Sequence, residues 1–480
     1  MAALGRASAV AFALVLVFAV CRPLFTQDSQ PAKGAQIAKL PDGPTPSAAD
    51  SPKSATETVS EKTTTLAAEN STPAQRSVRI AALPELPTDS TSPDVLLERG
   101  LNCWAARDVG GARALLSRAA EAADTYAGGR AGILLALSLH WDGRHDEADA
   151  LTSRVSSSAP DAEMRALAVT VAEAQAAARQ GDFNAAADRY GAFAQQWNGT
   201  QSGAWAAIQE GSLYRDQLHD PERARAVYAQ VAKDYAGTPM EAEALLEIGN
   251  CLRWSEKGFE EAISVLQAAL DRAATRAVQM NAAYGIAACY VGMGEPAIAY
   301  DALTECIAAF PEAHFILERR AELALELGDW EAAAEDAAAF LQLSGGGAGQ
   351  QYDQTHMILG QLAFRRGDLD EAERNFAAAD EGNPDYRAEA SAAIANCRSA
   401  RGDLRGAVSA FLEAAAAPQP PPGERKQGKD LYLYGAAVAA SQLGDQGTLD
   451  QIIKQMVAEF PGSSFTTRLV GQEILPTPEI

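Results

Sequence analysis

Two closely spaced histidines are the first side chains that could carry chemistry. His140 and His145 are five positions apart, and imidazole is a common zinc ligand, but no third ligand stands at the spacing of a zinc site. The sequence has no G-x-S-x-G nucleophile turn, no H-E-x-x-H zinc helix and no complete phosphate loop. We therefore predict that the protein is not an enzyme and that it binds no metal and no cofactor.

A glycine-rich stretch and six cysteines are the remaining candidates. Residues 344–349 read Ser-Gly-Gly-Gly-Ala-Gly, but no Lys-Ser or Lys-Thr follows, so we expect a loop between helices. The cysteines are never spaced as C-x-x-C, and five of them fall in apolar helical stretches, where a small buried side chain is expected. The sequence leaves open whether Cys289 and Cys306 form a disulfide.

The composition predicts that helices position all of these residues. Alanine occurs throughout the chain, in runs such as residues 332–334 and 414–417, and β-branched residues do not cluster. Because alanine has the highest intrinsic helix propensity, we expect an all-α protein.

A recurring pattern divides the chain after residue 93 into about ten units. Each unit has a small anchor residue, usually alanine, which in most units is followed four positions later by a bulky residue. The anchors lie 34 to 42 residues apart, at Ala112, Ala148, Ala186, Ala224, Ala262, Ala299, Ala333, Ala372, Ala407 and Leu449. This period is typical of helix–turn–helix repeats that stack into a solenoid.

Turn residues recur at fixed places in these units. Gly-Asp pairs precede several anchors, as at Gly181-Asp182 and Gly402-Asp403. Glycine can end one helix with a positive φ, and aspartate can cap the next helix with its carboxylate. Prolines follow the second helix of several units, because proline cannot continue a helix. Each unit is therefore predicted to be two antiparallel helices joined by a tight turn.

On these residues the chain resembles the tetratricopeptide-repeat family over about 80% of its length. The resemblance implies a right-handed superhelix of about ten repeats over residues 93–475, followed by a tail at residues 476–480. Residues 463–474 are long enough for one short capping helix, which a solenoid needs to cover its last apolar face.

Residues 1–25 have the pattern of a targeting segment. The fifteen residues between Arg6 and Arg22 carry no charge, which is short for a membrane helix and suits the apolar part of a secretory signal. Three outcomes stay open: cleavage as a signal peptide, retention as a signal anchor, or lipidation at Cys21. Each implies export, so we expect a periplasmic or membrane-anchored protein that touches the membrane only through this segment.

Residues 26–92 have a different composition from the rest of the chain. They are rich in proline, serine, threonine and alanine and contain no aromatic residue. Such a segment cannot bury enough apolar surface to offset the entropy lost on ordering. We predict a disordered tether between the targeting segment and the repeats.

The charge distribution limits the classes of partner. The net charge is −23, and residues 1–92 contribute none of it because their charges balance. A strongly acidic repeat region repels phosphate backbones, so nucleic acid is not expected as a partner.

The family resemblance also implies where a partner would bind. In that family, positions 2, 5, 9 and 12 of the first helix of each repeat line the inner surface of the superhelix. Carried over to this chain, they give as candidate groove residues the apolar Trp205, Ile208, Tyr284, Phe315, Met357, Phe364 and Tyr434, the amides Asn250, Asn281, Gln361 and Asn396, and the acids Glu318 and Glu322. An acidic groove with aromatic side chains suits a peptide with apolar anchors and some basic residues. The alternative for any one aromatic is packing against a neighbouring helix.

Residues 228–251 add a resemblance to repeats of bacterial envelope proteins. These proteins include the Tol-Pal-associated coordinator and the lipoprotein partner of the outer-membrane β-barrel assembly machine. The resemblance implies the cell envelope as the compartment. We therefore expect a non-catalytic scaffold for protein–protein interactions in the envelope. The alternative is an accessory or regulatory subunit that modulates an envelope enzyme, such as a cell-wall synthase or a protease.

Overall fold

The computed structural model describes residues 78–87, 90–253, 258–344, 353–382, 387–417 and 428–471. Within these ranges every regular element is a helix, which confirms the predicted all-α repeat fold. The targeting segment, Cys21, most of the proposed tether, the loop at residues 345–349 and the C-terminal tail lie outside the described residues. None of the described helices is long and apolar enough to cross a membrane.

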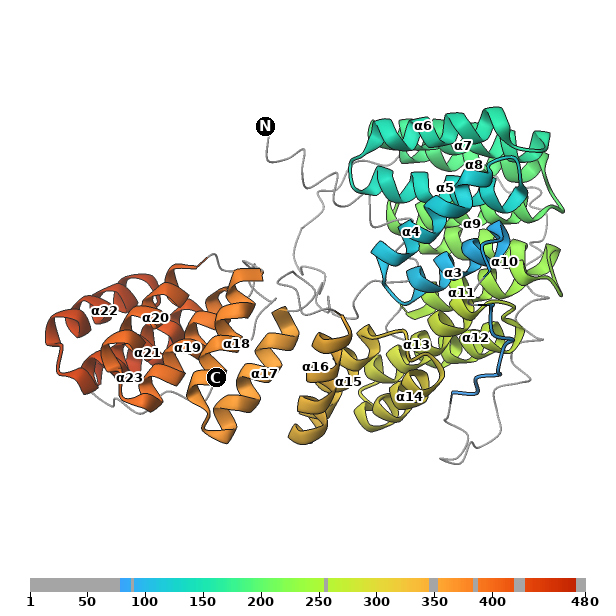
Figure 1. Ribbon diagram of the computed structural model, residues 1–480. Coiled ribbons are helices and arrows are strands. Elements are labelled where there is room, and N and C mark those ends of the chain that lie inside the picture. The colour runs from blue at the N-terminus through green and yellow to red at the C-terminus, as the bar shows by residue number, and fades with distance from the viewer. Residues whose placement is uncertain are drawn as a thin grey trace, which may run out of the picture.

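The described helices form ten antiparallel pairs, each with a first helix A and a second helix B (Figure 1). The A helices are α3 (Pro93–Ala105), α5 (Tyr126–Trp141), α7 (Ala162–Arg179), α9 (Gln201–Asp216), α11 (Pro239–Arg253), α13 (Arg276–Gly292), α15 (Phe315–Leu327), α17 (Asp353–Arg366), α19 (Arg387–Arg401) and α21 (Lys429–Leu443). The B helices are α4 (Val109–Ala119), α6 (His145–Ser158), α8 (Phe183–Gln196), α10 (Pro221–Asp234), α12 (Phe259–Arg272), α14 (Pro296–Ala309), α16 (Trp330–Leu343), α18 (Leu369–Gly382), α20 (Leu404–Ala416) and α22 (Gln446–Glu459). A short 3₁₀ helix, η3 (Ala120–Ala122), follows α4, and α23 (Ser464–Val470) ends the solenoid.

The turns between A and B helices have the predicted chemistry. Gly181 and Gly402 have φ of 79° and 87°, which is the left-handed region that favours glycine. The carboxylates of Asp182 and Asp403 accept hydrogen bonds from the backbone N–H groups of Ala185 and Gly406, three residues further on. These caps fix where each B helix begins, so they also fix the register of its buried face.

The anchor residues lie at the crossing of the two helices in each pair. All ten are at most 6% exposed, and eight of them, including Ala112 and Ala333, are fully buried. Glycines on the A helices allow the same close approach, because a Cβ at Gly249 would lie 2.5 Å from Leu266 Cγ. Small residues at these positions are therefore needed for the helices to pack closely.

The final helix covers the end of the solenoid as expected, although it is shorter than the predicted segment at residues 463–474. In α23, Leu469 is 2% exposed and Thr466 donates a hydrogen bond to the Phe460 carbonyl over 2.8 Å. Phe465 packs on Tyr434 of α21 with ring centroids 5.1 Å apart. Helix α23 thereby buries an apolar face of the last repeat that would otherwise be exposed to solvent.

The path of the superhelix brings the first repeat back onto the sixth. Helix α3 packs against α13 as well as against its neighbours α4 and α5. Figure 1 shows α3 to α14 coiled together, while α17 to α23 extend away from them as an arm. Contacts between α3 and α13 therefore cover part of the side on which the A helices meet.

The end of the proposed tether also lies against the solenoid. Val78 is 5% exposed, and its N–H donates a hydrogen bond to Glu305 Oε2 on α14 over 2.6 Å. The prediction that the tether is disordered as far as residue 92 is therefore wrong for residues 78–87. Aliphatic residues at spaced positions give this part of the segment apolar area to bury, which its overall composition does not reveal.

Candidate partner-binding surface

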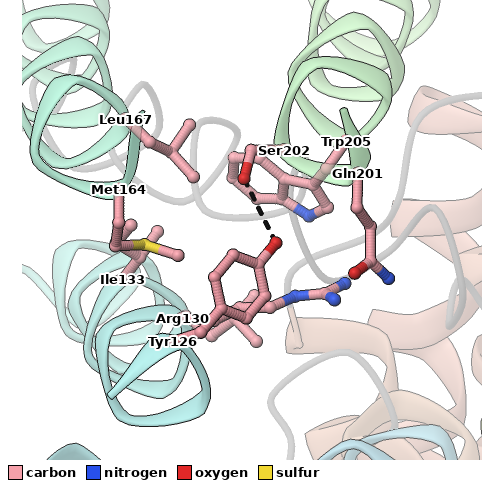
Figure 2. Close-up of a pocket in the computed structure, with 9 residues that line it drawn as sticks. Tyr126, Arg130, Ile133, Met164, Leu167, Gln201, Ser202 and Trp205 are labelled. Carbon is pink, nitrogen blue, oxygen red and sulfur yellow. Dashed lines mark hydrogen bonds between the residues drawn. The ribbon is translucent and has the colours of Figure 1, made fainter. Parts of the chain in front are cut away.

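The A helices provide the inner surface, and a pocket opens on it between α5, α7 and α9 (Figure 2). Successive A helices contact one another along this side, as α5 does with α7 and α7 with α9. The pocket is shallow, because its cavity volume is only about 10 Å³ and the rest of the space between the side chains is open to solvent. Its lining residues are Tyr126, Arg130, Ile133, Leu134, Met164, Leu167, Gln201, Ser202 and Trp205. Three consecutive repeats are therefore needed to form it.

The walls of the pocket are mainly apolar, with polar groups near the mouth. Met164 and Leu167 of α7 face the Trp205 indole across the cavity (Figure 2). The Trp205 ring is held by an edge contact with Tyr190, with centroids 6.1 Å apart and ring planes at 81°. Such packing fixes the indole in one orientation, so the apolar surface is formed before a ligand arrives.

Two polar features determine what the pocket can recognise. The Tyr126 hydroxyl and Ser202 Oγ lie 3.2 Å apart and tie α5 to α9 across α7. Arg130 extends from α5 towards the Gln201 side of the pocket (Figure 2). Burial raises the pKa of the Glu243 carboxyl on α11, and the charge of Arg130 opposes this rise. A guanidinium beside an apolar wall suits an apolar side chain that has a carbonyl or carboxylate close by.

Of the predicted groove residues, Trp205 is the one that lines this pocket, where it is 9% exposed. Ile208, one turn further along α9, is 6% exposed and belongs, as Trp205 does, to the core cluster of repeats two to five. The amides Asn250 and Asn281 are buried, and Asn250 Oδ1 accepts a hydrogen bond from Arg253 over 3.3 Å. Ile208, Asn250 and Asn281 are therefore mainly packing residues of the coil, and they contribute little open surface.

Tyr284 and Phe315 are covered by the first repeat, which corrects their assignment as open groove residues. Their rings form an edge contact with centroids 5.0 Å apart, and they are 4% and 6% exposed. The Arg107 guanidinium, from the turn between α3 and α4, lies 3.8 Å from the Phe315 ring centroid and 5.6 Å from that of Tyr284. Ala105 and Ala106 join the same apolar cluster. The two aromatics hold the first repeat against α13 and α15.

Replacing Arg107 with alanine should loosen this internal contact. A cation over an aromatic ring contributes about 0.5–2 kcal/mol, with the larger value for desolvated pairs. We expect amide hydrogen exchange in α3 and α4 to become faster, while exchange in α19 to α22 stays unchanged because those helices are far along the solenoid. Unchanged protection of α3 and α4 would contradict an anchoring role for Arg107.

The two predicted acids already have partners, Glu318 on α17 and Glu322 within α15. Glu318 Oε1 accepts a hydrogen bond from Thr355 Oγ1 over 2.6 Å, and Glu322 pairs with Arg319. Burial raises the pKa of Glu322 to about 7, with Glu318 adding to the rise and Arg319 opposing it. The inner surface at this point is therefore less acidic near neutral pH than the sequence implies.

The remaining predicted residues lie on the arm. Gln361 and Phe364 of α17 and Asn396 of α19 are half-buried and remain available as contact residues. Met357 is 8% exposed. Tyr434 is fully buried against Phe465, so its assignment to an open groove is wrong and its role is to pack against the capping helix.

Several pocket residues were not selected from the sequence. Arg130 stands at position 5 of α5, counted from Tyr126, so the rule that selected Trp205 would also have selected Arg130. The second repeat matches the family pattern weakly, and its helix A gave no candidate residue. Met164 and Leu167 had no such signal, because their part in the pocket depends on how α7 sits between α5 and α9.

His140 and His145 form a cluster with the guanidinium of Arg179. His140 Nδ1 and His145 Nδ1 lie 3.0 Å apart, and Arg179 Nη1 is 3.4 Å from His140 Nδ1. Burial and the charge of Arg179 lower the pKa of His140 to about 4. No group of three potential metal ligands occurs in the part of the chain that the structure describes. Cys289 and Cys306 are buried free thiols here.

Comparison with known proteins agrees with the repeat assignment. A family model described as tetratricopeptide repeat matches residues 209–278 and 284–348, which cover the second half of α9 and, apart from residues 279–283 of α13, the helices α10 to α16. The chain contains tetratricopeptide repeats. Proteins with this fold are typically non-catalytic and typically mediate protein–protein interactions. No curated protein sequence matches the chain.

Solved structures give distant likenesses to repeat proteins. The Pseudomonas aeruginosa PilF structure is 16% identical and covers 52% of this chain and 99% of its own, with a TM-score of 0.36. A tetratricopeptide-repeat protein from Parabacteroides merdae is also 16% identical, covering 57% of this chain and 99% of its own, with a TM-score of 0.37. PilW, a type IV pilus biogenesis factor, is 15% identical, covers 52% and 99%, and has a TM-score of 0.36. Likenesses of this degree carry no information about partners.

Proposed function

We propose that the protein is a non-catalytic scaffold that binds partner proteins on the inner surface of its repeats. The pocket between α5, α7 and α9 carries this proposal, because it presents preformed apolar walls beside a guanidinium and an amide. The partner segment that fits has an apolar side chain for the Trp205 wall and a carbonyl or carboxylate within reach of Arg130. Basic anchors, which the acidic composition suggested, fit this particular pocket less well.

The cell envelope is the proposed compartment. The uncharged stretch between Arg6 and Arg22 supports export, and the resemblance of residues 228–251 to repeats of envelope proteins supports the same location. In that setting the tether would hold the repeats near the membrane while they search for a partner. An accessory subunit that modulates an envelope enzyme remains the second candidate, favoured by the same location.

Crosslinking from the rim of the pocket tests the proposal. Gln201 is exposed at the mouth, so a photoreactive amino acid placed there should crosslink to a bound partner in intact cells. Replacing Trp205 with alanine in the same chain should reduce that product at least tenfold, since an aromatic anchor typically contributes 2 kcal/mol or more, about a thirtyfold change in affinity.

The matched control uses Val169, which is 46% exposed on α7 and does not line the pocket. A photoreactive residue at this position should give no such product. Equal labelling from Gln201 and Val169, or a product that survives the loss of Trp205, would contradict binding at the pocket. Whether the product contains an enzyme distinguishes the accessory subunit from the plain scaffold.

A further inference from the structure

Residues 78–87 show how the outer edge of the coil holds an extended peptide. The segment has no helical structure and passes beside α12, α13 and α14 before the chain enters α3 (Figure 1). Val78 is buried, and Ile80, Leu83 and Leu86 are half-buried, whereas the residues between them are exposed. Val78 and Ile80 therefore pack on the solenoid, and Leu83 and Leu86 continue the spacing of partly covered aliphatic residues.

Side chains of three helices satisfy backbone groups of this segment. The Val78 N–H donates to Glu305 Oε2 of α14 over 2.6 Å. Gln267 Nε2 of α12 donates to the Arg79 carbonyl over 3.3 Å, and Gln279 Nε2 of α13 donates to the Ala81 carbonyl over 2.8 Å. Contacts with backbone groups hold a peptide in an extended form without selecting its side chains.

Selection of side chains comes from the apolar cluster beneath. Val78 and Ile80 pack with the core cluster formed by α11 to α14, which includes Leu270 and Leu303. Arg79, between them, is 74% exposed in its side chain, and its guanidinium is 3.9 Å from Asp271. An exposed ion pair of this length contributes little, so the aliphatic residues determine the fit.

We propose that this edge, formed by Gln267, Gln279 and Glu305, is a second peptide-binding site that residues 78–87 occupy in cis. Its ligand class is an extended segment with aliphatic residues in the pattern aliphatic-x-aliphatic-x-x-aliphatic. The chain masks the site with its own copy of that pattern, and a partner segment must displace it. The site is separate from the Trp205 pocket, so it does not depend on the function proposed for that pocket.

Residues 78–87 should compete with a free peptide for the same site, so the proposal predicts a measurable difference in peptide affinity. A tethered segment acts at an effective concentration in the millimolar range, which weakens the binding of a free competitor. A labelled peptide with the sequence of residues 76–87 should therefore bind the full-length chain weakly. Full-length chain carrying Val78→Asp and Ile80→Asp should bind it at least tenfold more tightly, because the cis segment no longer fills the site.

Three controls identify the contacts. A peptide with the Arg79→Ala change should bind as well as the parent, whereas one with aspartate in place of Val78 and Ile80 should not bind. Adding Gln279→Ala to the opened chain should weaken binding about two- to tenfold, the usual effect of one hydrogen bond.

A measurement on the unmutated chain removes any dependence on how the variants fold. Excess free peptide should accelerate hydrogen exchange of the Val78 amide, whose hydrogen bond to Glu305 it would displace. Equal affinity of the peptide for the unmutated and the opened chain, absence of binding to both, or unchanged exchange of Val78 would each overturn the proposal.

Discussion

Replacing Arg215 with alanine is expected to lower the free energy of unfolding by about 3–5 kcal/mol, the usual cost of leaving a buried charge unpaired. The Arg215 and Glu247 side chains are 5% and 6% exposed, and they form an ion pair between α9 and α11. Arg215 also donates two hydrogen bonds of 2.9 Å to Asp216. Removing the guanidinium leaves Glu247 buried without its counter-ion.

The size of this effect should depend on pH. Burial raises the pKa of Glu247 and Arg215 opposes the rise, so the pKa should climb further when Arg215 is absent. A carboxyl whose pKa is raised by folding is neutral in the folded protein at low pH, and its destabilising effect grows as the pH rises above the unfolded value. Denaturant unfolding of the variant should therefore show a larger loss at pH 8 than at pH 5.

A double variant provides the control. Arg215→Met with Glu247→Leu removes both charges and keeps the volume, so it should recover most of the lost stability. Loss of less than about 1 kcal/mol in Arg215→Ala, or no recovery in the double variant, would contradict a stabilising buried pair.

Replacing Gly249 with valine should destabilise the fifth repeat by about 1–3 kcal/mol. A Cβ at this position of α11 would lie 2.5 Å from Leu266 Cγ and 2.6 Å from its Cδ2, closer than side chains tolerate. Leu266 is fully buried on α12, so it has no free space to move into. The two helices must separate, and the neighbouring repeats should loosen with them because each repeat is stabilised by its interfaces.

Thermal unfolding and a compensating change test this prediction. Leu266→Ala combined with Gly249→Val should recover part of the loss, with a coupling of about 0.5–3 kcal/mol in a double-mutant cycle. Gly447→Val is the matched control, because Gly447 is an exposed helical glycine with Asp445 Oδ1 no nearer than 3.6 Å. Equal destabilisation by the two glycine variants would show that backbone propensity, and not the helix crossing, is responsible.

The repeat architecture follows from local features of the sequence. Ala262 and Leu266 predicted a helix crossing that the structure contains, and Asp182 and Gly181 predicted a turn that it also contains. These residues act within one repeat, and their effects on helix ends and helix packing require no knowledge of distant repeats. A period repeated ten times therefore determines the fold class.

Only part of the candidate site could be predicted from the sequence. Trp205 was found because its helix position alone places it on the inner side. Tyr284 and Phe315 occupy comparable positions, yet Arg107 covers them. The difference arises because small rotations between successive repeats add up until α3 meets α13. This contact depends on all the repeats between the two helices, so it cannot be predicted from the sequence of any one repeat.

The sequence by itself therefore determined an all-α tetratricopeptide-repeat solenoid, the Gly-Asp turns between its paired helices and the small residues at its crossings. The tertiary structure decided which part of the inner surface stays open, that residues 78–87 bind the edge at Gln279, and that Tyr434 belongs to the core. The physical reason is the distance along the chain over which each effect acts. Capping and propensity act over a few residues, whereas exposure depends on every helix that the superhelix brings near.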